Sequence, residues 1–271
     1  MTRLINVRPS RRGRIVAGAV PILLLLLTYA IASSLRHADN PADKVLPTLG
    51  AMAAAFWRLA TETDPVTGQI TLIADTVASL YRMGAGLALA TLTALVLGLL
   101  LGVLPMARAV LGPVITVIAV IPPIAVLPIL FIALGLGEAA KIALIAIGIA
   151  PYMTRDLAGH VSALPAEQVI KAQTLGAGSW VVAIRVALPQ MMPRLIETLR
   201  LSMGPAWVFL IAAEAIASDV GLGYRIFLVR RYLAMDIILP YVAWISLLAI
   251  AADALLQFIG RKAFPWAGGA Q

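Results

Sequence analysis

The sequence contains no cysteine and only two histidines, His37 and His160, in 271 residues. Without cysteine there is no disulfide, no thiolate metal ligand and no cysteine nucleophile. The two histidines fall in different polar segments, so neither a metal site nor an acid–base site built on imidazole is expected. The sequence therefore predicts no catalytic residue, no metal and no cofactor.

Charged residues are also scarce. They make up 13% of the chain, against about 25% in an ordinary soluble domain, and hydrophobic residues make up 61%. Apolar segments recur along the whole length, which predicts a single all-α integral membrane domain. The net charge of +8 could suggest nucleic acid. However, the basic residues stand at the ends of apolar segments, so we expect a lipid bilayer as the partner and no nucleic acid.

The apolar segments predict six transmembrane helices at about residues 15–35, 76–104, 110–134, 138–154, 193–217 and 237–259. Residues 1–14 would form a cytoplasmic tail, and residues 15–271 a single membrane domain. The first segment could be a secretory signal. It is long enough to cross about 30 Å of hydrocarbon and further spans follow, which favours an uncleaved span.

The basic residues predict both termini in the cytoplasm. With six spans in that orientation, the inner segments hold twelve of them and the outer segments hold six. The inner set is Arg3, Arg8, Arg11, Arg12, Arg14, Arg108, Arg155, Lys171, Arg185, Arg194, Arg261 and Lys262; the outer set is Arg36, Lys44, Arg58, Arg225, Arg230 and Arg231. We expect Arg82, Lys141 and Arg200 to lie near span ends, where they can snorkel.

Smaller features refine the spans. Apolar residues at helical spacing over 46–60 predict an amphipathic helix packed on the outer side of the bundle. Gly98 and Gly102 have the small-xxx-small spacing that lets membrane helices approach closely.

The third segment contains Pro122, Pro123 and Pro128, which should kink or break it. Broken spans border transport pathways, so these prolines are pathway candidates, although helix packing explains them equally well.

The polar stretch 165–189 lies between two apolar segments, reads PAEQVIKAQTLGAGSWVVAIRVALP, and is predicted to be cytoplasmic. Pro165 suits the first turn of a short helix that ends at Gly176. Ser179 could cap a second helix, which Pro189 would stop. We interpret this helix–glycine–helix element as a docking element.

This stretch resembles the cytoplasmic coupling loop of ATP-binding-cassette (ABC) importer permeases. That family has Glu-Ala-Ala, three residues, Gly, nine residues and Ile-x-Leu-Pro. Here Gly176 is followed by nine residues and then by Val186-Ala187-Leu188-Pro189. Ile170-Lys171-Ala172 stands where the family has Glu-Ala-Ala, and only Ala172 matches. The resemblance implies an ATPase-coupling loop that comprises Glu167, Ala172, Gly176, Ala177, Val186, Leu188 and Pro189.

Further motifs in the same order resemble the permeases of nitrate, taurine and aliphatic-sulfonate importers. They are Ala78-Ser79-Leu80-Tyr81-Arg82, the segment 121–128 (IPPIAVLP), Gly135-Leu136-Gly137-Glu138, and Glu214 followed by Gly221-Leu222-Gly223-Tyr224. The resemblance implies the six-span type I importer permease fold in a bacterial inner membrane. It implies a homodimer of permeases, a cytoplasmic ABC ATPase dimer and an external solute-binding protein as partners.

Charges inside the predicted spans are candidates for function. Glu197 and Arg200 are expected to form a local ion pair, and Asp253 with Gln257 could bond another helix. Glu214 has no basic neighbour at helical spacing, and Trp207 lies two turns below it. A structural hydrogen bond and a role in the outer gate or pathway wall remain equally open for Glu214.

The sequence thus predicts a transport subunit, not an enzyme: the permease of an ATP-driven importer for a nitrate-, sulfonate- or taurine-like solute. A small nitrogenous solute is the alternative within the same machinery. An ion-coupled secondary transporter is the alternative from another class, but neither inverted repeats nor paired midplane carboxylates are evident.

Overall fold

The computed structural model describes residues 10–40, 43–65 and 67–266. In this part of the chain the regular structure is helical, and the only β-type pairing is one isolated bridge between Thr63 and Ile70. The elements are α1 (Arg11–Asp39), α2 (Leu49–Thr61), α3 (Thr71–Val103), α4 (Pro105–Val120), α5 (Pro123–Leu134), α6 (Glu138–Ser162), α7 (Ala166–Thr174), α8 (Ser179–Val182), the π-helical turn η2 (Ala183–Ala187), α9 (Leu188–Ala217), α10 (Leu222–Arg230) and α11 (Met235–Ala263).

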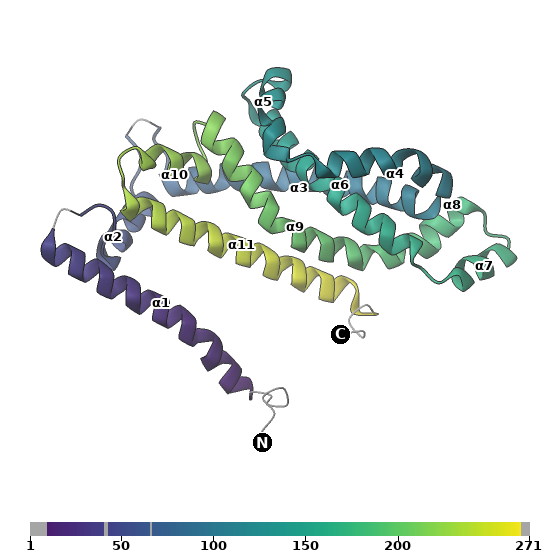
Figure 1. Ribbon diagram of the computed structural model, residues 1–271, viewed down its shortest axis with the longest axis horizontal. Helices are drawn as coiled ribbons and strands as arrows, with labels where there is room; N and C mark the ends of the chain where they lie inside the picture. The colour runs from purple at the N-terminus through teal and green to yellow at the C-terminus, as the bar shows by residue number, and fades with distance from the viewer. Residues whose placement is uncertain (1–9, 41–42, 66, 267–271) are drawn as a thin grey trace.

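The long helices α3, α6, α9 and α11 run side by side along the molecule (Figure 1). Helices α2 and α10 cover one end of this bundle, hereafter the α10 end. Helices α7 and α8 project from the opposite end, hereafter the α7 end. The predicted amphipathic helix is confirmed as α2, which packs on α11 through a contact between the rings of Phe56 and Trp244, 5.8 Å apart.

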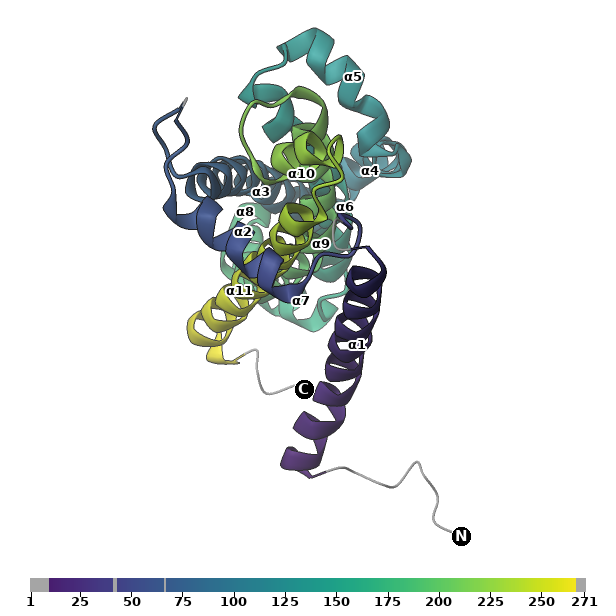
Figure 2. The same cartoon turned by 90° about the vertical axis from the view of Figure 1, so that its left-hand side faces the viewer.

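The third predicted span is broken. Helices α4 and α5 meet at an angle of 97° at Pro122, and α5 stands out from the bundle (Figures 1 and 2). The chain leaves α3 at the α7 end and enters α6 at the α10 end, so α4 and α5 together must cross the bundle. With the five helices that are long and apolar enough to span a membrane, the pair makes six crossings.

Helix α1 touches the rest of the molecule mainly through its last turns. The hydroxyls of Tyr29 and Ser33 donate to the backbone oxygen of Pro47, at 2.8 and 3.1 Å. The remainder diverges from the bundle (Figure 2). It exposes a run of leucines over residues 23–27. An apolar helix with so little protein around it is suited to lipid.

Glycines allow α3 and α6 to pack closely. A Cβ added at Gly98 would lie 2.8 Å from the Cβ of Leu157, and one at Gly102 would overlap Val161. The predicted small-residue contact is therefore confirmed. It extends to Gly86, where an added Cβ would lie 2.7 Å from the Cβ of Ile145.

We expect Gly86→Ala to destabilise the folded chain by about 1–3 kcal/mol, because the methyl group overpacks the α3–α6 contact. Gly84→Ala is the matched control. It lies on the same helix, and a Cβ there meets nothing within 4 Å. Thermal unfolding in detergent would compare the two variants, and equal unfolding temperatures would contradict this account of the interface.

Candidate functional site

The predicted docking element has the expected helix–glycine–helix form at its first bend. Gly176 has a φ of +84°, a conformation that side-chain-bearing residues resist. The N–H of Gly176 donates to the oxygen of Gln173 at 2.9 Å, and that of Ala177 donates to the oxygen of Ala172 at 3.0 Å. This pair of bonds is a Schellman motif. It gives three of the predicted residues, Ala172, Gly176 and Ala177, a shared task in ending α7.

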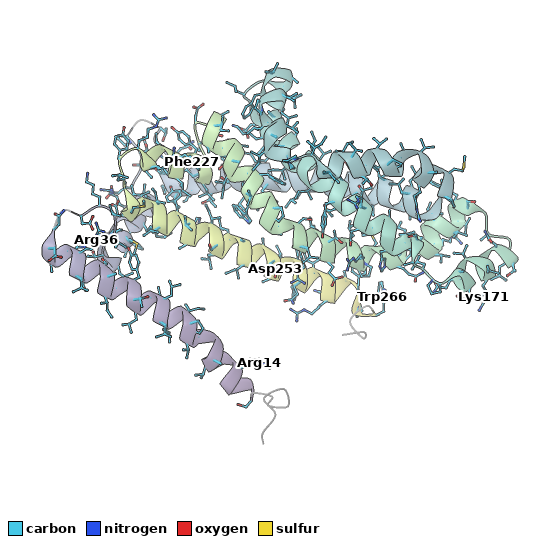
Figure 3. All side chains as sticks on the ribbon, viewed as in Figure 1. Arg14, Arg36, Lys171, Phe227, Asp253 and Trp266 are labelled. Carbon is cyan, nitrogen blue, oxygen red and sulfur yellow. The ribbon has the colours of Figure 1, made fainter. Side chains whose placement is uncertain are left out.

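The outer face of this element is apolar and open. Helix α7 has no buried residue, and Glu167 is exposed. Leu175 is 81% exposed and Trp180 is 70% exposed. Lys171 lies at the same projecting tip, far from the α10 end, where Phe227 is labelled (Figure 3). Large apolar side chains gathered beside a charged helix at the end of a bundle are typical of a surface that another protein covers.

The second half of the element differs from the prediction. Pro189 does not stop the helix, because α8 continues through η2 into α9 as one helical segment from Ser179 to Ala217. The N–H of Leu188 bonds the oxygen of Ala183, five residues back, so the π-helical turn accommodates the proline ring. Ser179 makes no capping bond either, since the N-cap is Gly178.

This continuity joins the docking element to a membrane span. Val186 and Leu188 are half-buried where η2 enters α9. The amide of Gln190 on α9 donates to the side-chain oxygen of Gln168 on α7 at 2.9 Å. A force on α7 or α8 would therefore act directly on α9.

The pathway candidates do not gather at one point. Pro122 lies at the α4–α5 break, and Pro123 begins α5, which contains Pro128. Trp207 on α9 is 5% exposed and belongs to the main hydrophobic core, whereas α5 packs through Leu127 and Leu130 in a second cluster. The pathway role of these residues stays a prediction.

Glu214 lies in a polar network at the α10 end that ties distant segments together. Its side chain is 0% exposed. One carboxylate oxygen accepts hydrogen bonds from the Ser79 hydroxyl and from the Arg82 guanidinium, both at 2.7 Å. The other accepts from the backbone N–H of Gly223 at 2.8 Å. These contacts give Glu214 a structural task, and its role in a gate stays a prediction.

Arg82 is the centre of this network. It is 2% exposed, so the expectation that it snorkels to a span end is wrong. Besides Glu214, it donates to both carboxylate oxygens of Glu138 and, at 2.7 Å, to the backbone oxygen of Val220. Lys141 is also buried and binds Glu138 at 3.0 Å. One guanidinium thus joins α3, α6, α9 and the segment before α10.

The glycines of the Gly221-Leu222-Gly223 motif are needed because this network lies so close. Gly221 has a φ of +137°, and a Cβ there would lie 2.6 Å from the Glu214 carboxylate. A Cβ at Gly223 would lie 2.9 Å from the backbone of Ile211. The N–H of Leu222 donates to the Ser79 oxygen at 2.8 Å. Residues from three of the quoted motifs therefore meet in one place.

Asp75 holds a second part of the network. Its carboxylate is fully buried and accepts from the N–H of Gly221, the Nε of Arg225 and the hydroxyl of Tyr241, at 2.9 to 3.0 Å. Burial would lower the pKa of Arg225, but the hydrogen bond to Asp75 and the attraction of the Asp75 charge act together against it, and the pKa lies above the ordinary value. This carboxylate therefore fixes α10 between α3 and α11.

Sequence reasoning missed these pairings because it sought partners at helical spacing. The side-chain partners of Glu214, Ser79 and Arg82, lie more than 130 residues upstream in the chain. Arg82 and Glu214 both stand inside motifs that carry the family resemblance, and this was the one signal in the sequence that pointed to both residues. The expected Glu197–Arg200 pair is also wrong: Arg200 binds Asp253 on α11 at 2.9 Å, and Glu197 binds Arg194 at 3.0 Å. Asp253 does bond another helix, as predicted, whereas Gln257 accepts a hydrogen bond from Arg261 of its own helix at 2.9 Å.

The fold and the site define a multi-pass membrane permease: a helical bundle with six crossings, a polar anchor at one end and a docking element at the other. A family model described as "Binding-protein-dependent transport system inner membrane component" matches residues 86–264. The chain belongs to this family of ABC importer permeases, whose members are transport subunits and not enzymes.

Individual relatives agree with this assignment. The chain is 36% identical to the taurine transport system permease TauC of Escherichia coli (strain K12) over 195 residues, which are 72% of this chain and 70% of that protein. It is 28% identical to the nitrate import permease NrtB of Leptolyngbya laminosa over 69% of this chain and 67% of that protein. An inward-facing structure of the MetNI methionine ABC transporter matches with a TM-score of 0.58 and 19% identity, over 70% of this chain and 92% of that chain.

Proposed function

We propose that this chain is the membrane subunit of an ATP-driven importer that works with a cytoplasmic ABC ATPase dimer, an external solute-binding protein and a second copy of itself. The observation that carries the proposal is the exposed apolar tip formed by Leu175 and Trp180, because Trp180 lies on the helical segment Ser179–Ala217 that includes α9. Nucleotide binding in the ATPase would move this tip, and α9 would transmit the movement to the α10 end.

We propose small anions of the sulfonate, taurine and nitrate class as the solutes. The support is the family assignment together with the taurine and nitrate permeases to which the chain is similar. A small nitrogenous solute is the alternative. An ion-coupled mechanism is not favoured, because the buried carboxylates Asp75 and Glu214 are bonded by arginines and are not free to exchange a cation.

Uptake of labelled taurine into vesicles tests this proposal. The vesicles would contain the permease and the ATPase, with the binding protein outside and ATP inside. We expect uptake that requires ATP and is inhibited by excess alkyl sulfonate or nitrate. Uptake driven by an ion gradient without ATP would refute the mechanism. Inhibition only by nitrogenous solutes that carry neither a sulfonate nor a nitrate group would refute the solute class.

We also propose that the α7 end is cytoplasmic, together with both termini. The start of α1 and the end of α11 point toward the α7 end, as an even number of crossings requires. In intact cells, an impermeant thiol reagent should label Arg230→Cys on α10 but not Lys171→Cys on α7. The chain has no cysteine of its own, so the background is clean. Labelling of Lys171→Cys from outside would reverse the orientation.

A further inference from the structure

A cavity of about 380 Å³ lies between α3, α4 and α6 near the α7 end, outside both parts of the site described above. Its apolar wall includes Leu101 and Ile115. Its polar lining is Arg108 and Thr116 from α4 and Arg155 and Ser162 from α6. None of the side chains that line it is acidic. The Ser162 hydroxyl donates to the backbone oxygen of Gly159 at 2.9 Å. The two guanidinium groups and the Thr116 hydroxyl can still supply several hydrogen bonds to an oxyanion.

The two arginines differ in how they are held. The Nε of Arg108 donates to the oxygen of Leu101 at 2.9 Å, and one terminal nitrogen donates to the oxygen of Gly102 at 3.0 Å. Arg108 therefore binds the last carbonyls of α3 and is fixed at the mouth of the cavity. Arg155 makes no hydrogen bond or ion pair with any residue between 10 and 266 that the structure describes, and its whole fork is available to a ligand. The carboxylate of the neighbouring residue Asp156 forms an ion pair with Arg194 at 2.6 Å and not with Arg155.

The position of the cavity favours an anion that belongs to the membrane surface. In the proposed orientation it lies at the cytoplasmic end of three spans, where anionic headgroups would be within reach. Basic pockets between spans on this side are suited to the phosphate of an anionic lipid. A second hollow of about 260 Å³ shares Arg108 and Ser162 and is lined by Val169 of α7 and Val182 of α8. Whatever occupies the first cavity therefore adjoins the docking element.

We propose that the cavity lined by Arg108 and Arg155 binds a phosphate group, carried by an anionic phospholipid or free in the cytoplasm. The arginines neutralise the phosphate, the hydroxyl of Thr116 donates to one of its oxygens, and the apolar wall receives the adjoining carbon chain when the group is a lipid. An occupant would brace α4 against α6 where both adjoin the docking element.

The test uses the full chain purified in detergent and titrated with dioleoylphosphatidylglycerol, dioleoylphosphatidylcholine or inorganic phosphate, with the unfolding temperature and native mass spectrometry as readouts. We expect phosphatidylglycerol to bind tighter than phosphatidylcholine. Arg155→Gln should weaken phosphatidylglycerol binding about tenfold, which corresponds to about 1.4 kcal/mol. Arg14→Gln, which removes the same charge from the exposed start of α1, should change it less than twofold.

A second variant blocks the cavity without altering charge. Gly159 lines it, and a Cβ there meets nothing within 4 Å, so Gly159→Leu should fold and fill the space. The same loss in Arg155→Gln and Gly159→Leu supports the site. Competition by inorganic phosphate would then identify a free anion as a ligand. If inorganic phosphate does not compete, the ligand is a lipid. Equal binding of the two lipids, or unchanged binding in both variants, would overturn the proposal.

Discussion

Arg82→Gln is expected to lower the free energy of unfolding by about 3–5 kcal/mol, because it leaves the carboxylate of Glu214 buried without its cationic partner. Glu214 is 0% exposed and cannot turn to water or to headgroups. The same change removes the bonds of Arg82 to Glu138 and to the oxygen of Val220. Thermal unfolding in detergent and the fraction of monodisperse protein would measure the loss.

The control for this substitution is Arg36→Gln. Arg36 also pairs with a carboxylate, that of Asp43, but the Arg36 side chain is 52% exposed, and without it Asp43 keeps a hydrogen bond from the N–H of Val45 at 3.0 Å. Exposed ion pairs contribute only about 0–1 kcal/mol, so the same loss of charge should have little effect there. Similar unfolding temperatures for Arg36→Gln and Arg82→Gln would contradict the assignment of Arg82 as a buried anchor.

The double variant Arg82→Gln/Glu214→Gln separates the buried charge from the rest of the network. It removes both charges of the pair, so it should recover part of the stability lost in Arg82→Gln. Glu214→Gln alone leaves Arg82 bonded to Glu138 and to Val220, and we expect it to fold. If Glu214 also serves as a gate, this single variant will take up solute poorly while it still assembles with the ATPase. Normal uptake by Glu214→Gln would show that Glu214 has a structural role and no role in a gate.

The spans were predictable from sequence because hydropathy acts locally along the chain. The segment expected at 76–104 is α3, from Thr71 to Val103, and the start of α6 was placed correctly at Glu138. The end of α6 was placed too early because its last turns are polar. That helix continues to Ser162, and Asp156 on those turns is bound by Arg194 of α9. Polar residues lower the hydropathy and so mark the end of a predicted span, but the helix itself can continue through them.

The long-range pairing of charges could not be predicted in this way. A single sequence gives the faces of each helix but not which faces meet, so Arg82 could be placed at a span end but not beside Glu214. The bend at Gly176 was predictable because a glycine often follows the end of a helix. In the Schellman motif the residue at this position has a positive φ, which glycine adopts readily. The continuation through Pro189 was not, since it depends on a π-helical turn that the sequence does not mark.

That bend provides the second large effect. Gly176→Val should uncouple the permease from its ATPase while the membrane spans stay folded. A β-branched residue at a φ of +84° is strongly disfavoured, so the chain would leave this conformation and break the two backbone bonds that end α7. Helix α7 would then change direction relative to α8, and the apolar tip at Leu175 and Trp180 would lose its shape.

Gly178→Val is a closely matched control. Gly178 lies two residues away and is equally open, with nothing within 4 Å of an added Cβ, but its φ of −72° and ψ of 166° suit valine. We expect the ATPase to co-purify with Gly178→Val and to be lost, at least tenfold, from Gly176→Val, with both permeases unfolding at the wild-type temperature. Loss of the ATPase from both variants would mean that bulk at this surface matters and the backbone of Gly176 does not. Retention in both would mean that the ATPase docks elsewhere, because no contact made through α7 could survive the change in its direction.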